Sequence, residues 1–215
     1  MKRPTVIVLA AGQGKRFAGP SHKLTQRLGQ FSVLGTTLHH VVDSGLPMVL
    51  VTTIDLAHEA RGLVDVRDIE IMPTASAPGV GRRWGMGVSI AAGVSARPDA
   101  AGWLVVPGDM PMIRSATLRA VADGLEPYPA VYAQYHGRQG HPVAFAAELY
   151  SELVQLDGDE GARRLLARYP SQGIDVDDPG VLQDVDTQDD LLQLRRSLEP
   201  DSESADHLAH SGAQH

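Results

Sequence analysis

Residues 5–17 read TVIVLAAGQGKRF, an apolar and largely β-branched run that breaks into small residues, two glycines and two cations. Such a run is typical of a buried strand, and the residues after it indicate a turn at the strand's carboxyl end. Small side chains let a ligand approach the backbone, whose N–H groups can face phosphate oxygens while Lys15 and Arg16 supply positive charge. The stretch therefore predicts a nucleotide-binding loop.

Two common nucleotide loops do not fit this stretch. A dinucleotide fold needs a third small residue where Phe17 stands, and an acid about 20 residues further on, whereas the next carboxylate is Asp43. Gly14 and Gly19 have the spacing of a P-loop, but Pro20 replaces its lysine. The loop belongs to another class of nucleotide-binding protein.

Length and composition exclude several other classes. A chain of 215 residues that is 43% hydrophobic can bury one good core. A formal net charge of -7 argues against a nucleic-acid partner, and the lack of cysteine excludes disulfides and thiolate catalysis. No segment reaches the roughly 18 apolar residues of a membrane span, and no signal-peptide pattern precedes the first strand. We expect a soluble cytoplasmic protein with no membrane partner.

The first half alternates strand-like and helix-like patterns. Strands are predicted at 5–10, 48–53, 69–72 and 102–106, and helices at 32–44, 56–64, 83–96 and 115–124. Because these strands lack polar alternation, we expect an α/β fold with a mostly parallel sheet in a Rossmann-like three-layer α/β/α arrangement.

The second half has a different character. A hairpin is predicted from strands 130–135 and 141–145 around the loop 137–140, as a small excursion from the sheet. Further elements are expected at 147–155, 160–169, 173–176 and 187–198, all helices except the third. We expect one domain over 1–198 and a disordered tail over 199–215, which lacks hydrophobic periodicity.

Acidic residues follow two later segments. In the run WLVVPGDMP, Asp109 follows the apolar strand residues directly after a turn-forming Pro-Gly pair. It is therefore expected at the same sheet edge as residues 12–16, the glycine loop, where a carboxylate is a natural ligand for Mg²⁺. Asp184 and Asp186 alternate before the last helix, and Asp189 and Asp190 in its first turn are explained by the helix dipole. The alternative for Asp109 is a simple turn residue.

A helix start rich in glycine lies between these motifs. Gly85 and Gly87 flank Met86 and would expose backbone N–H groups to an anion or a base edge, with Ser89 as the nearby hydroxyl. The alternative is that the apolar residues here, Ile90 above all, are only core residues at helical spacing.

The pattern Leu9 to Gly12, with Arg16 and Lys23, resembles the signature of the MobA-like NTP transferases, and its two alanines resemble the molybdenum cofactor cytidylyltransferase branch. The resemblance implies a loop that grips the base and triphosphate of CTP, with Arg16, Lys23 and Asp109 as catalytic residues. The implied nucleotide-binding residues are Leu9, Ala10, Ala11, Gly12, Gly14, Lys15, Gly85, Met86 and Ser89.

The same resemblance implies a metal and an acceptor. Mg²⁺ (or Mn²⁺) would bind Asp109 with Asp186 as the first choice of second ligand and Asp184 as the other. The run 137–143, GRQGHPV, resembles a substrate loop in which Arg138 and His141 meet the acceptor, although a histidine before proline is often structural. Ala18, Gly87 and Gln188 depart from the family pattern.

The implied reaction is CMP transfer from CTP to a molybdopterin-type acceptor with release of pyrophosphate. A molybdenum hydroxylase or its insertion chaperone is the implied protein partner. Two alternatives stay open: the same chemistry with GTP or another phosphorylated acceptor, and a non-catalytic carrier of molybdopterin or nucleotide.

Overall fold

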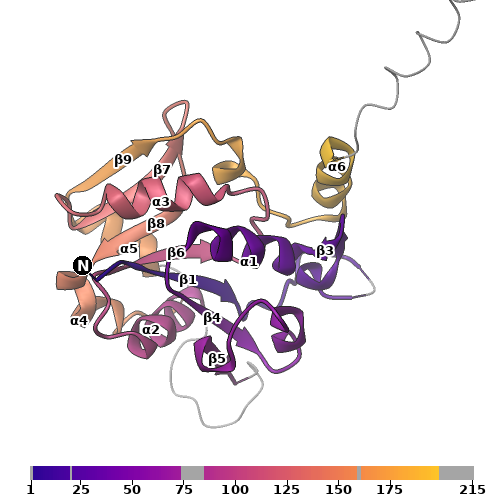
Figure 1. The fold of residues 1–215 in the computed structure, drawn as a ribbon, viewed down its shortest axis with the longest axis horizontal. Helices are drawn as coiled ribbons and strands as arrows, with labels where there is room; N and C mark the ends of the chain where they lie inside the picture. Colours follow the sequence, from indigo (N-terminus) through magenta and orange to yellow (C-terminus); the bar gives the residue numbers. More distant parts are fainter. Residues whose placement is uncertain (1, 20, 74–84, 159–160, 199–215) are drawn as a thin grey trace, which may run out of the picture.

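The computed structural model describes residues 2–19, 21–73, 85–158 and 161–198. A seven-stranded sheet with the order β5-β4-β1-β6-β8-β7-β9 runs through its centre (Figure 1). The strands are β1 (Thr5–Ala10), β4 (Met48–Thr53), β5 (Ile69–Met72), β6 (Gly102–Pro107), β7 (Ala130–Tyr135), β8 (Arg138–Ala146) and β9 (Ser171–Asp175).

Strands β5, β4, β1 and β6 are parallel, and β8 joins them antiparallel to β6. Strand β7 is antiparallel to β8, while β9 is parallel to β7. The predicted mostly parallel α/β sheet is therefore confirmed, and the hairpin is an integral part of it. Residues 138–140, predicted as a loop, belong to β8, because His136 and Gly137 complete the turn with φ values of 48° and 73°.

Six helices flank the sheet among the described residues. They are α1 (Val33–Ser44), α2 (Met86–Ala96), α3 (Ser115–Asp123), α4 (Tyr150–Leu153), α5 (Gly161–Arg168) and α6 (Gln188–Leu198). Short 3-10 turns lie at η1 (Lys23–Thr25), η2 (Ala57–Ala60), η3 (Val66–Asp68), η4 (Ala147–Leu149) and η5 (Pro179–Leu182). None of these described helices is long and apolar enough to cross a membrane.

Local signals account for both ends of α1. Ser32 caps α1 by accepting a hydrogen bond from the Gly35 N–H at 3.0 Å, and Gly45 ends it in the left-handed region. The predicted helix 56–64 is wrong beyond the 3-10 turn η2, because the chain leaves the helical path at Arg61 (φ -59°, ψ 129°) and Gly62 follows with a φ of 78°. Residues 83–84 and 160 of two predicted helices, and the predicted tail 199–215, lie outside the described residues.

The core lies on both faces of the sheet, because successive side chains of a strand point to opposite faces. Val6 and Val8 of β1 face the layer that holds α1 and α3, whereas Ile7 faces the layer of α2, α4 and α5 (Figure 1). Helix α2 comes close to the sheet because Gly93 has no side chain: a Cβ there would lie 2.5 Å from the Ile7 side chain.

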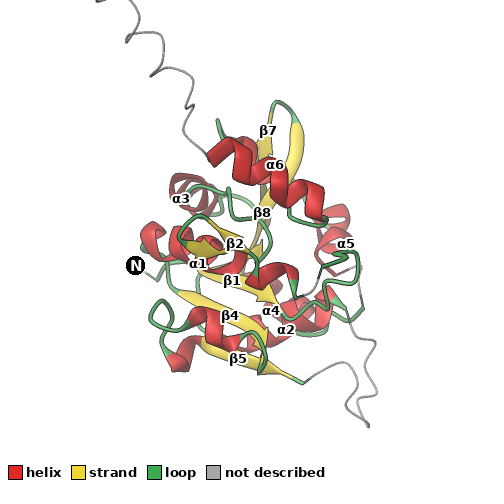
Figure 2. Cartoon of the chain, turned by 90° about the vertical axis from the view of Figure 1, so that its right-hand side faces the viewer, coloured by secondary structure: helices red, strands yellow, loops and turns green. Residues whose placement is uncertain are grey.

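Helix α6 lies beyond the carboxyl ends of β1 and β6, apart from the helical layers that cover the two faces of the sheet (Figure 1). It contacts a small ribbon of β2 (Arg27–Leu28) and β3 (Phe31–Ser32), and Arg195 donates to the Arg27 carbonyl at 2.7 Å. Strands β1 and β6 point toward this side of the molecule, which Figure 2 turns toward the viewer. The C-terminal helix is therefore held next to the edge where the glycine loop follows β1.

Candidate active site

A cavity of about 520 Å³ opens at the carboxyl ends of β1 and β6, a volume typical of small-ligand sites. Thirteen of the predicted site residues line it: Leu9, Ala10, Ala11, Gly12, Gly14, Lys15, Arg16, Lys23, Gly85, Met86, Ser89, Asp109 and Asp186. Four separate segments of the chain therefore converge on one hollow, as the position of ligands in open parallel sheets leads us to expect.

Asp109 is placed by backbone contacts at the end of β6. The Gly108 N–H donates to the Leu9 carbonyl at 2.8 Å, which joins the ends of β1 and β6. The Thr37 hydroxyl of α1 donates to the Gly108 carbonyl at 3.0 Å. These two bonds fix the peptide before Asp109 and direct its carboxylate toward the glycine loop.

Asp186 is brought to Asp109 by the segment before α6. The Val185 N–H donates to the Asp109 carbonyl at 2.9 Å. Asp190 accepts from the N–H groups of Asp186 and Thr187 at 3.1 and 2.7 Å, and the Asp190 N–H donates to the Thr187 hydroxyl, which is a reciprocal cap of α6. The structural role predicted for Asp190 agrees with this geometry, because its carboxylate shapes the turn that presents Asp186.

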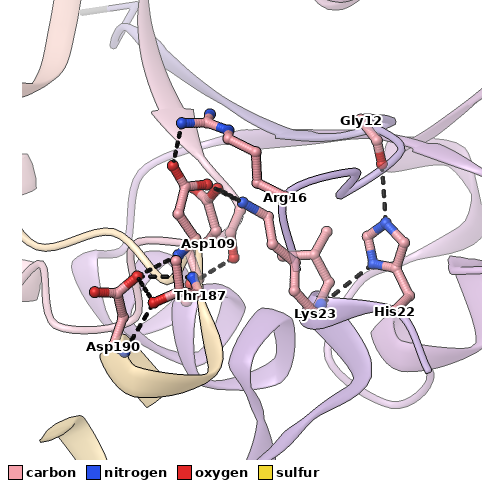
Figure 3. A network of polar contacts seen from close by, with 11 residues as sticks. Gly12, Arg16, His22, Lys23, Asp109, Thr187 and Asp190 are labelled. Atoms are coloured by element: carbon pink, nitrogen blue, oxygen red, sulfur yellow. Dashed lines mark hydrogen bonds and ion pairs between the residues drawn. The ribbon is translucent and has the colours of Figure 1, made fainter. Parts of the chain in front are cut away.

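Lys23 lies between the two carboxylates (Figure 3). Its Nζ is 2.6 Å from Asp109 Oδ2 and 2.7 Å from Asp186 Oδ1, and only 12% of its side chain is exposed. Arg16 pairs with the other oxygen of Asp186 at 2.6 Å. Burial opposes the charge of Lys23, but the two carboxylates, Asp109 foremost, outweigh it and hold the pKa of Lys23 above its ordinary value.

This pair of carboxylates suits a divalent cation, and the Lys23 ammonium already occupies a cation position between them. Within the described residues no cluster of three His, Asp or Glu side chains could enclose a metal ion on its own. Two carboxylates completed by phosphate oxygens and water are the ligand set that Mg²⁺ commonly takes. Asp109 and Asp186 are therefore the residues that could hold a metal together with a bound phosphate.

The helix start at Gly85 faces the same cavity, and the next glycine explains a departure from the family pattern. A Cβ on Gly87 would lie 2.7 Å from the Asp157 carbonyl, and the Gly87 N–H donates to the Gly158 carbonyl at 2.8 Å. A serine there would displace the 157–158 backbone. The glycine lets this loop pack against the first turn of α2 and leaves Met86 and Ser89 on the cavity wall.

Three predicted residues are not among the described residues that line the cavity. Asp184 is exposed, yet partial desolvation, followed by the charges of Asp186 and Asp109, raises its pKa. Arg138 is exposed at the start of β8. His141 lies beside the end of β6, and its Nδ1 is buried without a hydrogen-bond partner. Burial lowers the pKa of His141, although a hydrogen bond to the Val105 backbone and the charge of Asp109 act in the opposite direction.

His22 is a cavity residue that the sequence analysis did not single out. It belongs to no motif, and its place next to Lys23 was the one available signal. The cavity is also lined by four residues that were not predicted: Gln13, Leu24, Pro73 and Pro107.

A glycine loop facing a pair of acids at the carboxyl edge of a Rossmann-like sheet defines the class of nucleotide-binding α/β enzymes to which nucleotidyltransferases belong. The chain belongs to the MobA-like NTP transferase domain family, whose model matches residues 6–173. The matched region is accordingly a nucleotidyltransferase domain.

Known proteins extend this assignment over most of the chain. The purine catabolism protein PucB of Bacillus subtilis is 27% identical over 92% of this chain and 100% of its own length. The structure of Rv0371c from Mycobacterium tuberculosis is 28% identical, with a TM-score of 0.74 over 91% of this chain and 100% of that one. A second structure of Rv0371c is a manganese complex, with 26% identity and a TM-score of 0.71 over the same shares.

The bifunctional protein GlmU matches a smaller region. GlmU of Leifsonia xyli is 31% identical over 148 residues, which are 60% of this chain and 28% of that protein. In GlmU of Corynebacterium aurimucosum the match spans 23% of the protein. The chain thus spans about a quarter of these relatives.

Proposed function

We propose that this nucleotidyltransferase transfers CMP from CTP to the phosphate of a molybdopterin-type acceptor, with Mg²⁺ (or Mn²⁺) held by Asp109 and Asp186. The observation that carries the proposal is the carboxylate pair sharing one cation position, 2.6 and 2.7 Å from Lys23 Nζ, opposite the glycine loop. A structure of the similar protein Rv0371c is a complex with manganese, which supports a divalent metal in the proposed reaction.

The choice of CTP and of the acceptor has separate support. Ala10 and Ala11 line the cavity at the end of β1, in the form that resembles the CTP-using branch. The full-length relative in Bacillus subtilis is a purine catabolism protein, and a molybdenum hydroxylase or its insertion chaperone is the partner such a cofactor would serve.

In this mechanism an oxygen of the acceptor phosphate attacks the α-phosphorus of CTP in line. The new P–O bond forms as the bond from Pα to the bridging oxygen breaks, and that oxygen leaves with its electron pair on pyrophosphate. No protein nucleophile takes part, so the enzyme supplies alignment and neutralisation of charge. The metal, when bound, neutralises charge on the α-phosphate and the incoming oxygen.

The cations of the chain act on the leaving group. Arg16 is 80% exposed at its side chain, so its guanidinium can leave Asp186 for the β- and γ-phosphates without a large desolvation cost. Lys23 occupies the position between the two carboxylates, so its ammonium would have to leave if a divalent cation bound there, and it would then be available to neutralise phosphate charge. Arg138 and His141 are proposed to face the acceptor from β8, with Asp184 as the second candidate for the second metal ligand.

The test is a pyrophosphate-release assay that compares the four NTPs, each with molybdopterin and with sugar and alcohol phosphates, in Mg²⁺ and Mn²⁺. We expect turnover with CTP and molybdopterin. Turnover with GTP alone would contradict the interpretation of Ala10 and Ala11. Tight, metal-independent nucleotide or molybdopterin binding without pyrophosphate release would identify a carrier.

A further inference from the structure

Among the described residues that line the cavity, His22 carries the one imidazole, and it lies between the glycine loop and the turn carrying Lys23. Its Nε2 is 2.9 Å from the Gly12 carbonyl oxygen, and its Nδ1 is 3.2 Å from the Leu24 N–H (Figure 3). We propose that His22 is a positioning residue that holds the glycine loop at a fixed distance from Lys23.

The two contacts define the state of the ring. A backbone N–H only donates, so Nδ1 must carry a lone pair, and a carbonyl oxygen only accepts, so Nε2 must carry the proton. Both bonds are therefore made together only by the neutral Nε2–H form. The ring links the loop after β1 to the first turn of η1, ten residues further along the chain.

The backbone on both sides is shaped for this ring. Gly14 has a φ of 59°, and a Cβ on it would lie 3.2 Å from His22 Nε2, so the loop folds closely against the imidazole. On the other side the Thr25 hydroxyl donates to the His22 carbonyl at 2.8 Å and fixes the turn. Lys23 follows His22 directly, and its ammonium reaches Asp109.

This geometry gives His22 a role that the family signature does not contain. The loop N–H groups and the Lys23 ammonium must face the same triphosphate, yet they belong to segments with no strand pairing between them. A hydrogen bond from His22 to Gly12 holds them in register before nucleotide binds, which lowers the ordering cost of binding. The inference rests on the proposed function only in that a triphosphate occupies the cavity.

Two substitutions separate the two bonds. In His22→Gln the side-chain amide nitrogen replaces Nε2 and can still donate to Gly12, whereas in His22→Asn the shorter side-chain oxygen replaces Nδ1 and retains only the cap on Leu24. His58→Gln is the matched control, because His58 is an exposed histidine outside the cavity lining.

Binding of Mg²⁺-tripolyphosphate and of Mg·CTP is measured by calorimetry, with Tm recorded for every variant. We expect His22→Gln and His58→Gln to stay within about threefold of the parent, and His22→Asn to bind about tenfold more weakly at a similar Tm, the scale of one hydrogen bond. Equal weakening by Asn and Gln, unchanged binding in both, or a greater loss in Gln would overturn the proposal.

A second measurement needs no nucleotide. The ¹⁵N resonances of His22 in the full chain at neutral pH report the tautomer, and we expect a protonated Nε2 beside an unprotonated Nδ1. An Nδ1–H form or a freely averaging ring would overturn the link to Gly12. If the Asn and Gln variants separate with tripolyphosphate while CTP is not the preferred nucleotide, the proposed substrate fails and the role of His22 stands.

Discussion

Two buried or partly buried carboxylates, Asp109 and Asp178, are satisfied in opposite ways. Asp178 is 2% exposed and accepts hydrogen bonds from the Arg114 N–H, the Thr117 hydroxyl and the Gly180 N–H at 2.9, 2.6 and 3.0 Å. Asp109, with 19% of its side chain exposed, contacts the ammonium of Lys23 and opens onto the cavity.

The difference lies in what neutralises each carboxylate. The three groups that hydrogen-bond Asp178 belong to the backbone and to a short side chain, so they cannot leave, and the carboxylate joins the start of α3 to η5. The Arg114 guanidinium also pairs with Asp178, but at the longer distance of 3.9 Å. Lys23 has a long flexible side chain, and its ammonium can be exchanged for another cation. A carboxylate with fixed donors stabilises the fold, whereas one with a movable cation is available for chemistry.

The largest effect should come from Asp109→Asn. We expect kcat for pyrophosphate release to fall about 100-fold or more, because a preorganised charge is lost at the reacting phosphate. Stability should change little, since one member of a carboxylate pair loses its charge. Asp189→Asn, an exposed acid in the first turn of α6, is the matched control and should retain activity within about threefold. Equal losses in both variants would contradict the comparison.

Asp178→Asn should have the opposite profile. An amide can accept on one atom only, so at least one of the three donors would face an N–H group and lose its partner. We expect the free energy of unfolding to fall by about 2–3 kcal/mol in urea titrations, while the folded enzyme keeps its metal affinity. A stable Asp178→Asn protein with impaired Mn²⁺ binding would show that the two carboxylates are not distinct in role.

Lys23→Met tests whether the Lys23 ammonium and a metal ion occupy the same position. Without nucleotide, Mn²⁺ would no longer compete with the ammonium, so we expect its affinity to rise about tenfold, as removal of a neighbouring like charge predicts. Affinity for Mg·CTP should fall, because a phosphate ligand is lost. Mn²⁺ binding followed by electron paramagnetic resonance measures the first effect, with Lys2→Met as the control. Unchanged Mn²⁺ affinity would mean that the metal and Lys23 do not share a position.

The smallest effect concerns Asp184, an exposed carboxylate whose strongest electrostatic neighbours are two other acids, Asp186 and Asp109. Burial, then the charges of Asp186 and Asp109, raises its pKa above the ordinary value of 3.8, so the folded state binds this proton more tightly than the unfolded chain does. The ionised form therefore costs stability, and the cost appears as pH rises above 3.8.

Asp184→Asn should accordingly raise Tm by a few degrees or less at pH 7 in EDTA, on the size scale of small stability changes in such domains. The gain should shrink as the pH falls through 3.8 and disappear well below that value, where the carboxyl is protonated in both states. Calorimetry across this range measures it. A loss of Mn²⁺ affinity in Asp184→Asn, with no gain in stability, would make Asp184 the metal ligand.

Much of the fold was predictable because it is encoded locally. The bounds of β1, β4, β5 and β7 agree with the predicted ranges 5–10, 48–53, 69–72 and 130–135, since apolar runs between turn residues define a buried strand. The helix over 56–64 was wrong because its apolar spacing was helical, whereas Arg61 is extended and Gly62 takes a left-handed conformation. A glycine permits that conformation without requiring it, so the pattern alone did not decide.

Most of the predicted site residues line one cavity, while their roles stay predictions. Their motifs mark residues that end parallel strands or begin helices, and most of these line the cavity. His22 was missed because its importance depends on a carbonyl ten residues away, and no local pattern records that contact.

The sequence by itself determined the parallel strands, the glycine loop, and a family membership that the family model confirms. Only the tertiary structure decided that Lys23 bridges Asp109 and Asp186, 86 and 163 residues away, and that Asp186 lines the cavity while Asp184 does not. The reason is that strand and turn preferences arise between chain neighbours, whereas a shared cation position exists only after long loops have closed and distant carboxylates have been packed together.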